Sequence, residues 1–421
     1  MHMETRNSKT EMPLFKVKGE KFIFVGEKTI MKLSDMCIMF GDGDWIESKD
    51  QSDDGIRLLQ TGNIGEGKFL EKGGKERFIS RETFEKLKCK EVFSGDILIS
   101  RLPEPVGRAC LVPEKKQRMI TAVDCTICRI DDKKIRRRYL CYYLQSANYY
   151  TQLKNSITGT TRKRISRKNL GNIEIKIPSD KKQEEVIKQL DLIVEIIDNK
   201  KKKLQLLDTL VKSRFVEMFG DSKINPNNYP ICQLSEYINF LTSGSRGWAK
   251  YCIDSGREWF ITIKNVKDCN ISVDNMQSIN APDNAEAKRT KVQEGDLLIS
   301  ITADLGRTGV ITKEIAEHGA YINQHLTRIC LNQAILNPLY VAYFMETPAG
   351  KEQFESKNQS AVKAGLNFNS INSLKIMIPP MDVQNKFVAF VNQVNKSKSK
   401  IQKSLEETQL LFDSLMQKYF G

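Results

Sequence analysis

The chain has 421 residues, with 66 Lys and Arg against 52 Asp and Glu and a formal net charge of +14. This length allows two domains that each bury a core, and no apolar run is long enough to cross a membrane, so we expect no membrane association. The positive charge favours a polyanionic partner such as nucleic acid, although a generally Lys-rich composition would give the same balance. Ten cysteines at irregular spacing, without a secretory leader, favour reduced thiols and a cytoplasmic location.

One long sequence unit occurs twice in this chain, with an offset of about 200 residues between the copies. The sequence Gly-Asp-Ile-Leu-Ile-Ser at 95–100 reappears as Gly-Asp-Leu-Leu-Ile-Ser at 295–300, and Phe219-Gly220 reappears as Phe420-Gly421. Solenoid repeats are several-fold shorter. The sequence therefore predicts a duplication in which each copy is a whole domain with a connecting segment.

Each copy begins with short strand-like runs between Gly and Asn residues and changes once to a helical pattern, near Pro178 and Pro379. We predict an α+β class with two tandem mixed α/β domains. Expected strands lie at 96–100, 173–177, 296–301 and 374–378, and expected helices at 139–145 and 340–345. The predicted segments are a poorly ordered lead-in at 1–28, a first domain at 29–178, a central helix at 179–220, a second domain at 221–378 and a C-terminal helix at 379–421.

The two predicted long helices carry a heptad pattern, because their apolar positions recur at alternating steps of four and three. The pattern predicts that the two helices pair as an antiparallel coiled coil and give the chain an internal pseudo-two-fold axis; two separate amphipathic helices are the alternative. Each of the two patterns also carries one lysine, Lys200 or Lys398, and a polar residue at such a step commonly fixes register. The expected pairing residues are Leu190, Ile193, Ile197, Leu204, Leu207, Val391, Val394, Ile401, Leu405 and Phe412.

The segment from Ser156 to Lys168 is rich in Gly and Thr and ends in clustered cations, as a phosphate-binding loop would. Its expected DNA contacts are Arg162, Lys163, Arg164, Arg167 and Lys168; a merely solvated charged loop is the alternative. The counterpart at 360–369 offers only Lys363 and Asn367. Because base recognition depends on the side chains presented, the two copies are expected to recognise different half-sites.

A tryptophan lies among glycines and charges near the start of each domain. We expect DNA contacts from Trp45, Lys49, Arg246, Trp248 and Lys250, although tryptophans more often anchor packing than stack on bases. The residues around His325 are compatible with a DNA contact, but a hydrogen-bonded structural role for this histidine is at least as well supported.

Three segments are similar to catalytic or metal-binding motifs but have simpler structural explanations. Asn337-Pro338 fits a helix start, and Pro282-Asp283 with Glu286 fits a turn into a helix. Cys125 and Cys128 would face opposite sides of a strand, so we expect no zinc or other metal. The sequence predicts no catalytic residue.

Two domains of about 150 residues, each followed by a heptad helix ending in Phe-Gly, resemble the specificity subunits of Type I restriction-modification systems. The resemblance also rests on Gly41–Lys49, on Gln60–Ile64, on the two Gly-Asp strands and on Ile376–Pro380 leading to Gln384. The chain departs from the family pattern at Ser179-Asp180, where Pro-Pro is usual, and in its weakly basic second loop.

The resemblance implies a non-catalytic, sequence-specific reader of a bipartite asymmetric site in double-stranded DNA. It implies that the globular domains are target recognition domains and that the helices are spacers, which dock two adenine methyltransferase (modification) subunits. Restriction subunits can join this assembly. S-adenosylmethionine and ATP are then expected only on the partners, and no cofactor on this chain. The alternatives are a fused active methyltransferase or nuclease, and a coiled-coil scaffold that binds proteins.

Overall fold

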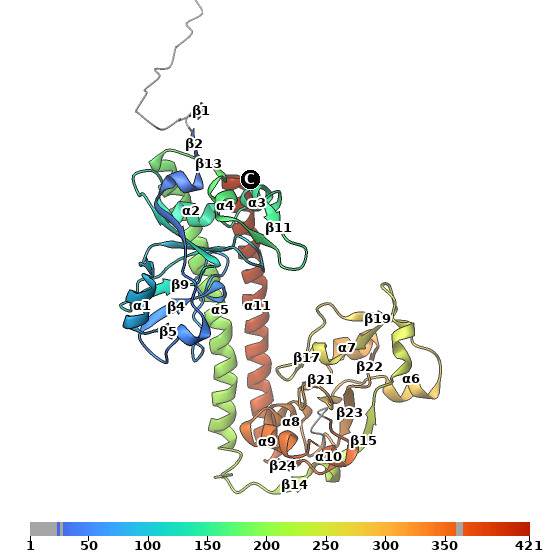
Figure 1. Ribbon diagram of the computed structural model, residues 1–421. Coiled ribbons are helices and arrows are strands. Elements are labelled where there is room, and N and C mark those ends of the chain that lie inside the picture. Colours follow the sequence, from blue (N-terminus) through green and yellow to red (C-terminus); the bar gives the residue numbers. More distant parts are fainter. Residues whose placement is uncertain (1–22, 26–27, 359–364) are drawn as a thin grey trace, which may run out of the picture. The chain divides into compact units, whose positions relative to one another are not determined.

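The computed structural model of the chain describes residues 23–25, 28–358 and 365–421. It contains two compact units, one formed by residues 1–199 with 405–421 and the other by residues 200–404. Each unit holds one α/β body and part of each of two long helices (Figure 1). We call the α/β bodies the first head (residues 28–178) and the second head (residues 221–378).

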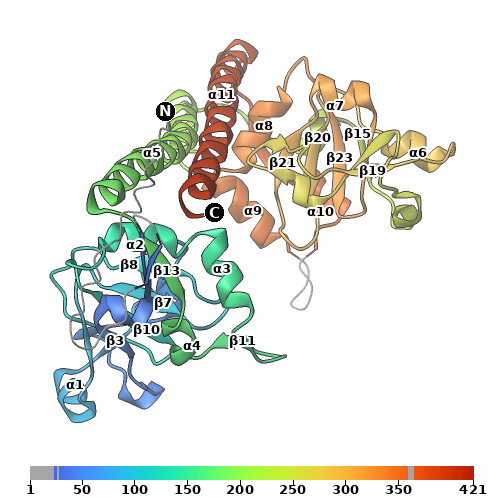
Figure 2. The same cartoon turned by 90° about the horizontal axis from the view of Figure 1, so that it is seen from above.

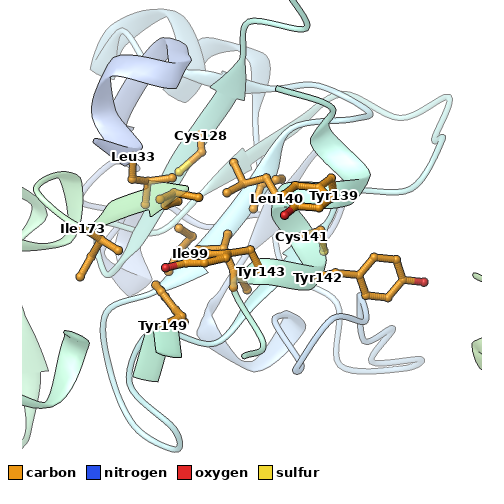
Figure 3. Close-up of a cluster of buried hydrophobic side chains, with 14 of the residues drawn as sticks. Leu33, Ile99, Cys128, Tyr139, Leu140, Cys141, Tyr142, Tyr143, Tyr149 and Ile173 are labelled. Carbon is orange, nitrogen blue, oxygen red and sulfur yellow. The ribbon is translucent and has the colours of Figure 1, made fainter. Parts of the chain in front are cut away.

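The first head is built on a central antiparallel sheet in the order β3–β10–β7–β8. Its strands are β3 (Cys37–Asp42), β10 (Cys125–Ile130), β7 (Ile97–Ser100) and β8 (Ala109–Leu111). Both faces are buried: Ile97 and Ile99 point into the helix-covered core that Figure 3 shows, and Leu98 points into a second apolar cluster. The second cluster contains residues of another sheet, so the head has three layers.

The remaining elements of the first head surround this sheet. A sheet in the order β5–β4–β9–β6 consists of Phe78–Ile79, Ile56–Leu59, Met119–Thr121 and Glu91–Val92, with β4 and β9 parallel. A sheet in the order β1–β2–β13 consists of Ile23–Val25, Lys28–Lys32 and Glu174–Ile177. The helices are α1 (Arg81–Leu87), α2 (Arg137–Tyr143), α3 (Ala147–Lys154) and α4 (Arg167–Gly171). Strand β1 lies within the lead-in predicted at residues 1–28, and it forms there because it pairs with the edge of β2.

The second head repeats this plan. Its central sheet has the order β15–β23–β20–β21, with strands Ile238–Ser243, Leu326–Leu331, Leu297–Ser300 and Thr308–Val310. The smaller sheets are β19–β16–β22 (Gln277–Ile279, Glu258–Ile261, Ala320–Ile322), β14–β24 (Ile231–Gln233, Lys375–Met377) and β17–β18 (Val266–Lys267, Asn270–Ile271). Its helices are α6 (Ala285–Thr290), α7 (Lys313–His318), α8 (Pro338–Met345), α9 (Pro348–Ser356) and α10 (Phe368–Asn372). The matching strand orders confirm the predicted tandem mixed α/β folds.

The repeated Gly-Asp pair has a structural role in both heads. Gly95 and Gly295 have positive φ angles of 88° and 81°, which glycine adopts without strain. The Asp96 carboxylate accepts two hydrogen bonds from Arg129, at 2.8 and 3.0 Å. Asp296 pairs with Arg328; burial raises the pKa of the Asp296 carboxyl, and the Arg328 hydrogen bond opposes this rise. The motif therefore marks a buried carboxylate whose ion pair with an arginine ties two strands of each central sheet together.

The two long helices are α5 (Asp180–Phe219) and α11 (Met381–Phe420), each of 40 residues. In the first unit Val186 and Leu190 share a core with Met416 and Phe420. In the second unit, the Lys200 ammonium donates to the Ser404 carbonyl at 2.8 Å, and Lys398 pairs with Asp208. Within the second unit the contacting residue numbers rise along one helix and fall along the other, so the helical segments pack antiparallel there.

All ten expected pairing residues are buried or half-buried, and both predicted lysines make polar contacts between the helices within the second unit. The two units divide the chain within both helices. The pseudo-two-fold axis and the domain boundaries proposed from sequence therefore stay predictions.

The phenylalanine that ends each long helix is buried in the head of the other copy. Phe420, from the second copy, lies against Tyr139 and Tyr143 of the first head, with ring centroids 5.2 and 6.0 Å apart. Phe219, from the first copy, lies 4.8 Å from the Tyr340 ring of the second head. Each compact unit is therefore completed by a helix end from the other copy.

A buried glutamine joins each long helix to the head that precedes it. The Gln183 side chain accepts from the Arg136 N–H and donates to the Pro178 carbonyl. The Gln384 side chain accepts from the Asn337 N–H at 2.9 Å, and its amide donates to the carbonyls of Ile335 and Pro379 at 2.9 and 2.8 Å. The N–H groups of Arg136 and Asn337, at the starts of α2 and α8, have no partner within their helices and are satisfied by these glutamines.

Gln384→Leu is expected to lower the free energy of unfolding by about 2–4 kcal/mol, because it leaves buried backbone groups without partners. Urea denaturation of the full chain measures this change. Gln393→Leu is the matched control, since the Gln393 side chain is exposed on the same helix. Equal stability of the two variants would contradict the structural role of Gln384.

Candidate nucleic-acid interface

The loops of the first head gather at one end of its central sheet. Because the strands are antiparallel, β3 and β7 end where β8 and β10 begin. The backbone N–H of Ile165 donates to the Arg101 carbonyl at 3.2 Å, which brings the predicted phosphate-binding segment to the same place. We call this surface the loop end of the first head; it comprises residues 43–55, 101–108, 122–124 and 157–168.

The predicted phosphate-binding segment forms a β-hairpin, a geometry that the sequence did not predict. Strands β11 (Ile157–Thr158) and β12 (Arg164–Ile165) pair antiparallel, and the Ile165 side chain is fully buried. Figure 2 shows β11 extending from the head next to α4. The base of the hairpin is thus fixed in the core while its tip is solvent-exposed. All five predicted cations of this segment are exposed: Arg162, Lys163, Arg164, Arg167 and Lys168.

Two arginines share one carboxylate at this loop end. The Asp42 carboxylate lies 3.3 Å from Arg101 Nε and 3.7 Å from Arg167 Nη1. Arg101 is buried and also donates to the Val123 carbonyl at 2.7 Å, so it orders this loop end from within, whereas the exposed Arg167 can face a polyanion. Arg101 was not among the residues predicted from the sequence; it follows the repeated strand directly and has Ile301 as its counterpart. That difference between the copies was the signal that could have found it.

Trp45 and Lys49 lie on the loop that follows β3. The Trp45 side chain is 71% exposed, and its indole N–H donates to Glu47 Oε1 at 3.4 Å. The Lys49 ammonium lies 2.7 Å from Glu47, and this hydrogen bond holds the pKa of the Glu47 carboxyl below its ordinary value. Both predicted residues are therefore accessible to a ligand.

The second head differs at the corresponding loop. Arg246 and Lys250 are exposed as predicted, but the Trp248 indole is only 1% exposed. Its ring packs 4.9 Å from Tyr321 and 6.1 Å from Phe260, centroid to centroid. The prediction that Trp248 contacts DNA is wrong, because the indole is buried in an apolar cluster with Phe260 and Tyr321.

The segment that precedes α10 corresponds to the hairpin of the first head. The Leu366 N–H donates to the Ile301 carbonyl at 2.9 Å, as Ile165 does to Arg101. The Asn367 side-chain oxygen caps α10 by accepting from the Ser370 N–H at 2.8 Å, a structural use that the sequence did not predict. Lys363 lies outside the described residues. DNA contacts by Lys363 and Asn367 stay predictions.

His325 is hydrogen-bonded within the second head. Its Nδ1 lies 2.6 Å from the Thr302 hydroxyl, and its Nε2 lies 3.1 Å from the Gln324 amide nitrogen. The structural interpretation of this histidine is thereby supported.

The three segments that are similar to catalytic or metal-binding motifs form the helix starts and the strand predicted for them. Asn337 caps α8 with Pro338 in its first turn, and Asn284 caps α6, which holds Glu286 and Lys288. Cys125 and Cys128 belong to different apolar clusters and face opposite sides of the central sheet. Among the described residues, no helix is long and apolar enough to span a membrane.

Two copies of a small α/β head, each followed by a long helix, place the protein in the class of internally duplicated proteins with helical spacers. The model of the Type I restriction modification DNA specificity domain family matches residues 26–209 and 255–408, which is more than half of the chain. The chain belongs to this family.

Curated relatives and solved structures agree with this assignment. The chain is 18% identical over 316 residues to the EcoBI specificity subunit of Escherichia coli and 22% identical over 302 residues to the EcoKI specificity subunit of strain K12. These matches cover 69% and 68% of this chain and 66% and 64% of the relatives, so they span slightly less than two thirds of those proteins.

Two solved structures share the fold. The crystal structure of a Type I restriction-modification S subunit from M. genitalium matches with a TM-score of 0.56 and 14% identity, covering 94% of this chain and 96% of that one. A chain from a structural study of complex assembly and conformational transition in a type I R-M system matches with a TM-score of 0.55 and 16% identity, covering 96% and 99%.

Trp248→Ala is expected to lower stability, whereas Trp45→Ala is expected to weaken DNA binding. Trp248→Ala removes a buried indole and should lower the free energy of unfolding by about 3–5 kcal/mol. Trp45→Ala should change it by less than about 0.5 kcal/mol, because the side chain is exposed. It should weaken duplex binding about tenfold, which is about 1.4 kcal/mol.

Thermal unfolding and fluorescence-anisotropy titration of both variants check these expectations, and each tryptophan serves as the control for the other. A stable Trp45→Ala variant with unchanged DNA affinity would remove Trp45 from the interface.

Proposed function

We propose that this protein is the DNA-specificity subunit of a Type I restriction-modification system. It reads a bipartite, asymmetric site in double-stranded DNA and directs partner adenine methyltransferase and restriction subunits to that site. The observation that carries the proposal is the pair of heads, which share one strand order but present different side chains at their loop ends.

The asymmetry of the heads supports two different half-sites. The first head exposes the Trp45 indole at its loop end, whereas Trp248 in the corresponding loop of the second head is buried. Asp42 of the first head is replaced by Ser243 in the second. Phosphate contacts fix register, whereas side chains that reach base edges determine sequence. Heads with the same backbone plan and different side chains would therefore read different sequences.

The long helices offer surface for the two methyltransferase subunits that we propose as partners. Several of their apolar side chains remain 46–68% exposed: Leu192, Leu206, Leu210, Leu410 and Leu411. Exposed apolar side chains on otherwise polar helices are typical of surfaces that a partner covers. Catalysis, S-adenosylmethionine and ATP then belong to the partners, this chain has no cofactor of its own, and the assembly acts on DNA in the cytoplasm.

The alternatives have less support. A fused methyltransferase or nuclease would need a catalytic motif, and the motifs that resembled one form a helix cap and a turn into a helix. A protein-binding scaffold would leave the five exposed cations of the anchored hairpin segment without a role.

Arg162→Ala combined with Arg164→Ala is expected to weaken duplex binding about tenfold and to make the salt dependence of log K shallower by about 2, since two phosphate contacts are lost. Titrations at several salt concentrations measure this slope. Lys201→Ala with Lys203→Ala removes the same charge from the exposed side of α5 and is the control. An unchanged slope in the arginine variant would exclude the hairpin from the interface.

Methylome sequencing tests the function as a whole. Cells that express this chain with its methyltransferase partner are expected to carry methylated adenine in a split motif, and cells that express either protein alone are not. Methylation by this chain alone would identify it as an enzyme. No methylation with both proteins present, together with the lack of salt-dependent binding to duplex DNA, would favour the scaffold.

A further inference from the structure

In both heads a cation holds the carbonyl at which the first central strand ends. In the first head the Lys90 ammonium donates to the Asp42 carbonyl at 2.9 Å. In the second head the Arg289 guanidinium donates to the Ser243 carbonyl at 2.8 Å and also to the Thr242 hydroxyl. Asp42 and Ser243 are equivalent, because each pairs with the second residue of its neighbouring strand, Thr126 or Thr327.

The two cations reach these carbonyls from different places in the fold. Arg289 belongs to α6, whereas Lys90 lies three residues beyond the end of α1, directly before β6. Glu91 pairs with Ile120 of β9, and Lys291 pairs with Tyr321 of β22, so Lys90 and Arg289 are one position apart in the repeat. A contact that is reached from two different positions indicates that the strand-end carbonyl needs a donor in both heads.

The start of the loop that follows each carbonyl also packs closely against backbone. A Cβ on Gly43 would lie 2.2 Å from the Thr121 carbonyl oxygen, and one on Gly244 would lie 2.1 Å from that of Asn323. Only glycine permits this approach. Each loop therefore starts where neighbouring backbone packs against its glycine and a cation holds the preceding carbonyl.

The same cations connect to further residues of these loops. Lys90 bonds the Asp44 carboxylate twice, through its ammonium at 3.1 Å and its backbone N–H at 2.7 Å. Arg289 lies 3.8 Å from Glu286, whose carboxylate accepts the Trp248 indole N–H at 3.4 Å. The loops fixed in this way carry the exposed Trp45 and Lys49 in the first head and Arg246 and Lys250 in the second.

We propose that Lys90 and Arg289 are positioning residues, each of which sets the base preference of one half-site by fixing the reading loop of its own head. The inference rests on the proposed function. A loop held in one conformation discriminates between bases more sharply than a loose one, since a loose loop can adapt to a wrong base.

The test is methylome sequencing with the full chain and its methyltransferase partner. Lys90→Met is expected to relax one half of the split motif, with about tenfold less discrimination at its bases, and to leave the other half unchanged. Arg289→Met is expected to relax the opposite half. Lys90→Arg keeps charge and donors and should restore the wild-type motif. Lys86→Met on α1 and Lys288→Met on α6 remove an exposed cation nearby and should change neither half.

The outcomes separate this inference from the function on which it rests. If wild-type protein yields no split motif, the proposed function fails and the inference fails with it. If wild type yields the motif but both Met variants keep it intact, relax the same half or relax both halves equally, only the positioning role is overturned. A Met variant with a lowered melting temperature is replaced by Lys90→Gln or Arg289→Gln, to which the same criteria apply.

Discussion

The burial of each helix-terminal phenylalanine in the head of the other copy is the interaction on which the arrangement of the chain depends. Phe420 completes the core that contains Tyr139 and Tyr143, and Phe219 completes the core that contains Tyr340. Burying one phenylalanine contributes about 1.5–3 kcal/mol. The exchange has a larger consequence than this energy, because neither copy of the repeat forms a complete core from its own residues. A compact unit of this protein is therefore made from both copies.

Around these exchanged helix ends, the two heads keep similar polar contacts through buried Asp and Gln side chains. The Asp96–Arg129 and Asp296–Arg328 pairs tie together equivalent strands, and Gln183 and Gln384 satisfy equivalent backbone groups. Such contacts tolerate little change, because a buried polar atom that loses its partner costs roughly 1–3 kcal/mol. The exposed loop ends have no such constraint, so the copies could diverge there while the scaffold stayed the same. A duplicated scaffold with divergent loops suits a protein that reads two different sequences.

The loop ends combine fixed and free parts. The hairpin of the first head is anchored by the buried Ile165 side chain, and the loop with Trp45 starts at the carbonyl that Lys90 holds. Exposed cations and an exposed indole lie beyond these anchors. Anchoring lowers the conformational entropy that binding must remove, while the exposed groups remain available for phosphates and bases.

The sequence by itself determined the duplication, the mixed α/β class and the helical spacers. These depend on patterns that recur at regular spacing, such as the Gly-Asp strands and the heptads with Lys200 and Lys398. It also placed the exposed cations from Arg162 to Lys168 correctly on the surface. Only the tertiary structure decided that the Trp248 indole is buried, that Arg101 and Arg167 share Asp42, and that each terminal phenylalanine enters the other copy's head. Each of these depends on residues far apart in the chain, for which local spacing and composition carry no signal.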